Sequence, residues 1–207
     1  MTIRQFRRRL QNQRKHALRS FERHRRKNLL ATPGEYAYII VLDQLKPTFN
    51  IGKIFRSAEA FGAHEVHVIG TPFFDPTPAM GSFKWVPARF HDTFDACYQT
   101  LRERGYSLFT LDPSTGTPLP ETTLPKNSAF IFGHEEFGIS FDPLDYEGIA
   151  SLRIPQLGKV QSLNVSIAAS LVMYEYTRQH GPPRTQPAPI PATADLITDN
   201  PDRSELF

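Results

Sequence analysis

The sequence predicts an α/β fold in which a parallel sheet is covered by helices on both faces. Strand-like apolar runs alternate with helical segments after residue 35, and these runs are apolar throughout, as buried parallel strands are. The 207 residues, 40% of them hydrophobic, can bury one substantial core. We expect a basic helical extension over residues 1–32, the α/β domain over 33–180 and a proline-rich, unstructured tail over 181–207.

The N-terminal segment is expected to form one amphipathic helix, with Thr2 as its N-cap. Its apolar residues recur at near-helical spacing; they are Ile3, Phe6, Leu10, Ala17 and Phe21. Residues 1–30 carry eleven Lys and Arg against Glu22 alone, a net charge of +10. The other 177 residues hold 13 basic and 20 acidic side chains, which leaves −7. Clustered Arg and Lys neutralise phosphates, so this basic segment points to RNA or DNA, whereas a solvated disordered arm is the alternative.

The first half of the domain is expected to form a strand–helix–strand unit. A Pro33–Gly34 turn precedes the β-rich run 36–42, which predicts the first core strand. The segment 50–62 predicts a helix that ends at Gly62, and EVHVIG at 65–70 predicts the second strand, followed by the loop TPFFDPTP.

The second half repeats this alternation. A helix is expected over 91–105, ending at Gly105, and the last helix over 162–179. Strands are expected at 107–112, 127–133 and 151–155. In open parallel sheets, ligands bind beyond the carboxyl ends of the strands. Three stretches near such positions combine glycine with polar groups: NIGKIFR at 50–56, GHEEFG at 133–138 and QLGKVQSLN at 156–164.

Several classes of site are excluded or disfavoured. The chain has no G-x-G-x-x-G after the first strand and no Walker A motif, which argues against nucleotide hydrolysis. The single cysteine, Cys97, excludes an internal disulfide and any thiolate metal cluster from one chain. Neither H-E-x-x-H nor a close Cys/His set appears, so we expect no metal and assign no catalytic role to His64, His67 or His134.

Membrane insertion and secretion are not expected. No run of 18 apolar residues offers a membrane span, and the basic N-terminus is not followed by the apolar segment of a secretory signal. We therefore expect a cytoplasmic protein.

The three polar stretches together resemble the motifs of the SpoU/TrmH family of RNA ribose 2′-O-methyltransferases in the SPOUT superfamily. The first resembles N-x-x-x-x-x-R, the second G-x-E-x-x-G, and IPQLGKVQSLNVSIA resembles the third and most specific motif. The resemblance spans roughly residues 36–178. It implies a deep trefoil knot, which is rare among folds, S-adenosyl-L-methionine bound in the knot, and an active site shared across a homodimer.

The resemblance also implies roles for individual residues. Those matching the catalytic positions are Asn50, Arg56, Glu135, Ser162 and Asn164. Those matching the cofactor contacts are Leu111, Gly133, Ile154, Gln156, Ser162 and Leu163. We expect RNA contacts from Arg56 and from the basic segment at Arg7, Arg8, Arg9, Arg14 and Lys15.

The chemistry requires few residues, because the sulfonium cofactor is already activated and the protein mainly aligns the hydroxyl and helps remove its proton. Arginine is a poor base, so Arg56 either acts with a nearby phosphate or only orients the ribose; a helix-surface pair with Glu59 is its structural alternative. Asn164 and Ser162 can also serve as helix caps. The stripe Leu163, Ile167, Leu171 and Tyr174 is expected in core or dimer packing.

The sequence thus predicts a methyltransferase that modifies a ribose 2′-hydroxyl of tRNA or rRNA. A non-catalytic RNA-binding or ribosome-assembly protein with the same fold is the main alternative, and transfer to a base nitrogen is a third. The sequence does not specify which nucleotide is modified.

Overall fold

The computed structural model describes residues 3–182, and its centre is a seven-stranded sheet. Every pair of neighbouring strands is parallel, in the order β3-β2-β1-β6-β4-β7-β5. The strands are β1 (Ile39–Asp43), β2 (Glu65–Ile69), β3 (Ala88–His91), β4 (Ser107–Leu111), β5 (Thr117–Pro118), β6 (Ser128–Phe132) and β7 (Ile149–Arg153). The parallel α/β sheet expected from the apolar runs is confirmed.

Within residues 3–182, four α-helices accompany the sheet: α1 (Ile3–Asn28), α2 (Phe49–Ala60), α3 (Phe94–Glu103) and α4 (Val165–His180). Short 3-10 turns lie at Thr77–Ala79, Ser82–Lys84, Leu119–Glu121 and Pro143–Asp145. Within the described residues, no helix combines the length and the apolar character that crossing a membrane requires. The proposed Thr2 cap and nearly all of the 181–207 tail lie outside the described residues.

The strands β3 and β5 were not expected, and β3 changes the boundary of a predicted helix. The edge strand β3 contains Arg89 and His91, so its run is not apolar throughout. His91 was expected to begin a helix but ends β3 instead. The helix α3 begins at Phe94, where the Thr93 hydroxyl accepts a hydrogen bond from the Ala96 amide at 3.4 Å.

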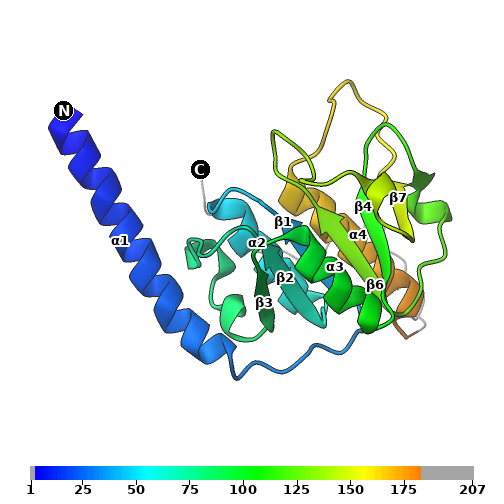
Figure 1. Ribbon diagram of the computed structural model, residues 1–207, viewed down its shortest axis with the longest axis horizontal. Helices are drawn as coiled ribbons and strands as arrows, with labels where there is room; N and C mark the ends of the chain where they lie inside the picture. Colours follow the sequence, from blue (N-terminus) through cyan, green and yellow to red (C-terminus); the bar gives the residue numbers. More distant parts are fainter. Residues whose placement is uncertain (1–2, 183–207) are drawn as a thin grey trace, which may run out of the picture.

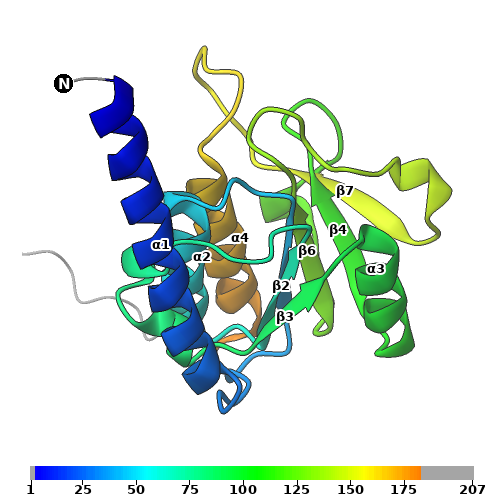
Figure 2. The same cartoon turned by 60° about the vertical axis from the view of Figure 1, so that its left-hand side comes forward.

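Alternate residues of each central strand face opposite layers of the molecule. In β1, Ile40 and Leu42 belong to the core cluster that includes α2 and α4, whereas Ile39 and Val41 belong to the cluster that includes α3. Figure 2 shows α1, α2 and α4 on one side of the sheet and α3 on the other. The prediction of helices on both faces is therefore confirmed.

The C-terminal part of α1 is fixed to the domain by an aromatic cluster. Phe21, Phe55, Phe74 and Phe83 pack with ring centroids 4.9–5.5 Å apart. Asn28 is buried and donates hydrogen bonds from Nδ2 to the carbonyls of residues 83 and 86. The N-terminal part of α1 projects away from the sheet (Figure 1). The basic segment is thus an extension whose C-terminal part packs against the domain.

The apolar stripe on α4 is not part of the core. Ile167, Leu171 and Tyr174 are 52%, 40% and 44% exposed, whereas Val172 and Met173 are fully buried. Of the two alternatives, core packing is wrong for these three residues, because α4 turns a different set of side chains toward the sheet; dimer packing stays a prediction.

Candidate active site

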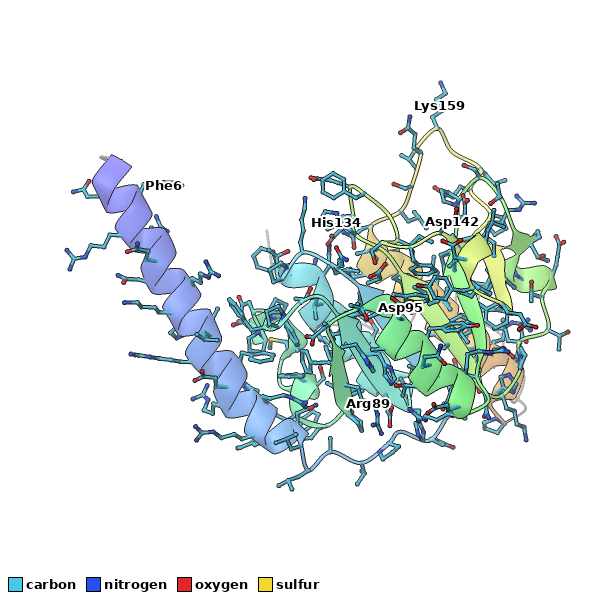
Figure 3. All side chains as sticks on the ribbon, in the orientation of Figure 1. Phe6, Arg89, Asp95, His134, Asp142 and Lys159 are labelled. Carbon is cyan, nitrogen blue, oxygen red and sulfur yellow. The ribbon has the colours of Figure 1, made fainter. Side chains whose placement is uncertain are left out.

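A cavity of about 800 Å³ lies where the loops after β4, β6 and β7 meet the N-terminus of α4. All six residues expected to contact a cofactor contribute to its wall: Leu111, Gly133, Ile154, Gln156, Ser162 and Leu163. The cavity lies at the carboxyl ends of parallel strands, where α/β proteins bind their ligands. Figure 3 shows His134, in the loop after β6, at the same end of the molecule as Lys159 in the loop after β7. The structure thus brings the second and third motif segments together.

A chain of hydrogen bonds joins one polar side chain from each of the three segments. The Asn50 amide nitrogen donates to Glu135 Oε1 at 2.8 Å, and the Asn164 amide nitrogen donates to Asn50 Oδ1 at 3.2 Å. The other carboxylate oxygen of Glu135 accepts from the Lys46 backbone amide at 3.2 Å. Asn164 Oδ1 also accepts from the Ser166 amide at 3.0 Å, which makes Asn164 the N-cap of α4. The cap prediction is confirmed for Asn164, whereas Ser162 lies two residues before the cap.

Gly133, at the start of the loop after β6, is required because the backbone of the same loop packs against it. A Cβ on Gly133 would lie 2.3–2.5 Å from backbone atoms of Gly138 and Ile139. His134 and Gly138 exchange two backbone hydrogen bonds of 2.8 and 2.9 Å, and Gly138 has a positive φ of 74°. The loop therefore folds back on itself, and it presents His134 and Glu135 to the cavity.

Two buried polar atoms in the cavity wall have no hydrogen-bond partner among the described residues. They are the hydroxyl oxygen of Ser151 and the side-chain carbonyl oxygen of Gln156. Leaving a buried polar atom unpaired costs roughly 1–3 kcal/mol. Neighbouring groups cover both atoms, so a ligand in the cavity would pair with them only after a local shift of the wall.

Two carboxylates in the cavity wall are held in their ionised form. Burial alone would raise the pKa of Glu135, but the hydrogen bonds from Asn50 and the Lys46 amide outweigh it and lower the pKa from its ordinary value. The pKa of Asp112 is lowered mainly by the hydrogen bond from the Thr115 hydroxyl and by the Ser114 amide. The wall can therefore accept hydrogen bonds and attract positive charge.

Arg56 does not line the cavity of its own chain. It is exposed on α2, and within the described residues it has no hydrogen bond or ion pair, including none with Glu59. Its neighbour Ser57 contacts Ser170 of α4 through a hydroxyl–hydroxyl hydrogen bond of 2.8 Å. Of the five expected catalytic residues, the structure brings Asn50, Glu135, Ser162 and Asn164 to the cavity or its rim and leaves Arg56 outside.

Asp112, Thr115 and Ser151 belong to the cavity wall but were not singled out from the sequence. Asp112 follows β4 directly, and its carboxylate accepts bonds from residues 114 and 115 in a turn. An Asp at a strand end before Pro-Ser-Thr is the sequence signal that could have indicated it. Ser151 lies inside β7, so no loop motif could point to it.

The side chains of Arg8, Arg9, Arg14 and Lys15 are exposed on α1, and that of Arg7 lies outside the described residues. The Arg14 guanidinium carbon lies 5.6 Å from the centroid of the Phe73 ring, a cation–π contact with the domain. Arg8 and Arg9 line a shallow depression on α1 with Gln5, Asn12 and His16. The helix thus presents several cations to solvent.

Two comparisons agree on where this chain belongs. Residues 37–174 match the model of the SpoU rRNA Methylase family. A tRNA (guanosine(18)-2′-O)-methyltransferase of Thermus thermophilus is 34% identical over 145 residues, which cover 68% of this chain and 74% of that enzyme. The Escherichia coli K12 enzyme of the same name is 31% identical over 144 residues, which cover 68% of this chain and 62% of the enzyme.

The fold also matches a solved structure of this type. The crystal structure of the SpoU methyltransferase AviRb from Streptomyces viridochromogenes, in complex with the cofactor AdoMet, has a TM-score of 0.61 and 25% identity. The match covers 72% of this chain and 59% of that one. By the extent of the family match and by its similarity to the Thermus enzyme, the chain belongs to the SpoU rRNA Methylase family.

Proposed function

We propose that this protein transfers a methyl group from S-adenosyl-L-methionine to a ribose 2′-hydroxyl of tRNA or rRNA. The observation that carries the proposal is the hydrogen-bonded chain of Asn50, Glu135 and Asn164, because each residue comes from a different family motif. Segments separated by more than a hundred residues thus meet beside one cavity. Homologues named for 2′-O-methylation of guanosine in tRNA support the same reaction.

The cavity fits a cofactor of this class. Its volume of about 800 Å³ lies in the range of small-molecule sites. The Ser151 and Gln156 oxygens, which no described residue pairs, would accept hydrogen bonds from a ligand's amino or hydroxyl groups after a local shift of the wall. Leu111, Ile154 and Leu163 supply apolar walls. When bound, the cofactor supplies a methyl group on a positively charged sulfur, and ionised Asp112 and Glu135 favour that charge.

The chain's own residues would mainly position the hydroxyl. Glu135 is ionised and fixed by Asn50, so it can accept a hydrogen bond from a ribose hydroxyl at the cavity rim. Asn164 is fixed twice, by Asn50 and by its cap to α4, so its orientation is set before substrate arrives. Arg56 would orient the ribose and its phosphate, and it would aid removal of the hydroxyl proton together with a nearby phosphate group.

The position of Arg56 supports a homodimer with a shared active site. Arg56 is exposed and does not line its own cavity, and the nearby helix α4 exposes Ile167 and Leu171. A second copy covering this apolar surface would bury it, and could bring its Arg56 to the first copy's cavity. Size-exclusion chromatography with light scattering should give a dimer that Ile167→Asp dissociates, while Leu30→Asp, at a residue 84% exposed in the turn after α1 and away from the cavity, does not. A wild-type monomer would contradict the shared site.

Two further parts of the proposal concern the fold and the location. We propose that the chain forms the family's trefoil knot around the loops after β6 and β7; the tight approach of Gly133 to the 138–139 backbone is compatible with this arrangement. We also propose a cytoplasmic location, where tRNA and rRNA are available.

The exposed cations of α1 would hold the RNA. Deleting residues 1–28 is a poor test, since it removes Phe21 and Asn28 from the folded core. Replacing Arg8, Arg9 and Lys15 by Gln leaves the packing of Phe21 and Asn28 intact. RNA affinity should fall, and the dependence of log Kd on log salt should become shallower by about one unit per lost phosphate contact. Unchanged affinity and slope would show that α1 does not contact RNA.

The reaction itself is tested with labelled cofactor. The purified chain is incubated with methyl-labelled S-adenosyl-L-methionine and, separately, total tRNA and rRNA, and the RNA is digested to nucleosides. Label in 2′-O-methylated nucleosides is the expected result. Label in methylated bases, or none in either pool despite cofactor binding by calorimetry, would contradict the proposal.

A further inference from the structure

Three metal-ligand side chains meet on the opposite face of the sheet from α4. His67 is in the middle of β2, His91 ends β3, and Cys97 is in α3, which covers this face. One potential ligand atom from each lies within 4.8 Å of the others. None of these residues lines the cavity described above.

The hydrogen bonds around His67 leave one ring nitrogen with two competing neighbours. Its Nε2 lies 3.0 Å from Glu65 Oε2, and an ionised carboxylate can only accept, so the proton belongs on Nε2. Both oxygens of Glu65 also accept hydrogen bonds from the guanidinium groups of Arg89 and Arg104, at 2.7 to 3.0 Å, so the side chain acts as an acceptor throughout. The unprotonated Nδ1 of His67 then faces both His91 and Cys97.

A single lone pair cannot serve both neighbours well. His67 Nδ1 lies 3.1 Å from His91 Nε2 and 3.4 Å from Cys97 Sγ. The lone pair lies in the ring plane and accepts one good hydrogen bond, so one of the two donors is poorly satisfied. A cation between the three atoms would satisfy all of them at once.

The spacing suits a tetrahedral cation. Bonds of about 2.0–2.1 Å to nitrogen and about 2.3 Å to sulfur place two nitrogen ligands about 3.3 Å apart and a nitrogen and a sulfur about 3.5 Å apart. The two observed distances from His67 Nδ1, 3.1 and 3.4 Å, are close to these values, and the His91 and Cys97 ligand atoms lie within 4.8 Å of each other. The carboxylate behind the far nitrogen of His67 is the usual second contact of a metal-bound histidine.

We propose that His67 Nδ1, His91 Nε2 and Cys97 Sγ bind one divalent cation of the zinc class. The cation takes the place of the Cys97 thiol proton, which is released to solvent, and two neutral imidazoles complete the protein ligands. Glu65 acts as a positioning residue that fixes the His67 tautomer. Since His91 is only half-buried, a water molecule can reach the fourth position.

A bound cation would cross-link three elements in addition to the hydrogen bonds between them. It links the edge strand β3 to β2 and to α3, and imidazole with thiolate selects zinc over magnesium or calcium. The three ligands lie 24 and 6 residues apart in sequence, so no compact metal motif is visible there. The expectation of no metal rested on that missing motif, and the fold supplies the proximity instead.

The test uses Co²⁺ as a spectroscopic probe on the full chain after removal of metal with a chelator. We expect saturation at one Co²⁺ per chain, with the visible bands of tetrahedral cobalt and a thiolate charge-transfer band, and displacement of both by Zn²⁺. Because Cys97 is the single cysteine, the charge-transfer band identifies its ligation. A folded chain that gives neither band holds only a hydrogen-bonded cluster, and the proposal is then wrong.

Variants sharpen the assignment. Cys97→Ser should lose the charge-transfer band, and Glu65→Gln should bind Co²⁺ about 10–100-fold more weakly. His64→Asn is the matched control, since His64 is a half-buried histidine directly before β2 and outside the cluster, and it should keep both bands. A charge-transfer band that survives in Cys97→Ser would overturn the assignment. The wild-type titration decides if a variant does not fold, and it does not depend on methyltransferase activity.

Discussion

The region beyond the carboxyl ends of the strands is packed in one half of the sheet and open in the other. Beyond β2, the connection is filled by the phenylalanine cluster of Phe21, Phe55, Phe74 and Phe83, which is buried completely or nearly so. Beyond β4, β6 and β7, the loops enclose a cavity of about 800 Å³. The same strand geometry therefore supports a packed half and an open half.

The difference lies in the residues that follow the strands. The connection after β2 brings large aromatic side chains that interlock, whereas the loops after β6 and β7 bring Gly133, Gly138 and Gly158, which fill no space. The open half also contains two buried oxygens that no described residue pairs, a cost that a packed core avoids. We expect stability to be concentrated in the packed half and ligand binding in the open half, which predicts opposite responses to substitution.

The largest effect is expected in the packed half. Phe74→Ala should lower the free energy of unfolding by about 3–5 kcal/mol, because it removes a fully buried ring that contacts three other rings. Urea denaturation followed by circular dichroism measures it. The same change at Phe137, a ring 81% exposed beside the cavity loop, should cost little. Equal losses at the two positions would mean that the two halves do not differ in packing.

The packed half was largely predictable from the sequence. The sequence predicted β1, β2 and α2 to within a few residues, as strands at 36–42 and 65–70 and a helix at 50–62. Short apolar runs bounded by turn residues indicate buried strands directly. The edge strand β3 was not predicted, because an exposed strand with Arg89 and His91 has no apolar signature. Nor could the sequence show that Phe21 joins the core, since that contact depends on where α1 ends.

A smaller and opposite pair of effects is expected in the open half. Gln156→Leu removes an unpartnered buried oxygen, so the free energy of unfolding should stay equal or rise by about 1 kcal/mol. Binding of S-adenosyl-L-methionine, measured by calorimetry, should weaken about 10-fold if the cofactor satisfies that oxygen. Gln161→Leu in the same loop, at an exposed glutamine, should change neither quantity. Unchanged cofactor affinity in Gln156→Leu would separate this oxygen from the cofactor site.

The site was predictable wherever a motif carried it. All six expected cofactor residues line the cavity, and Asn50, Glu135 and Asn164 are joined by hydrogen bonds. Arg56 lies outside the cavity of its own chain because it is on an exposed face of α2. Ser151 and Asp112 depend on strand order, which places β7 beside β4, and no local pattern reports that order.

The smallest effect concerns the titration of Glu135 at the rim of the open half. Its pKa lies below the ordinary value of 4.5, because hydrogen bonds from Asn50 and the Lys46 amide outweigh its partial burial. Asn50→Ala removes one donor and should raise that pKa, as followed by carboxyl-carbon NMR. The pKa of Glu175 on α4 is lowered by its hydrogen bonds with Arg178 and Gln179 instead, so it should not move and serves as an internal reference.

The sign of the accompanying stability change follows from linkage. Because folding lowers the pKa of Glu135, its contribution is present above the unfolded value of 4.5 and is lost as pH falls through the folded value. The difference in unfolding free energy between wild type and Asn50→Ala should therefore shrink as the pH is lowered through this range. Solvent screens this exposed carboxylate, so the difference is small even near neutral pH. An unchanged Glu135 pKa in the variant would show that Asn50 does not hold the carboxylate in solution, and the hydrogen-bonded chain across the three motifs would lose its central link.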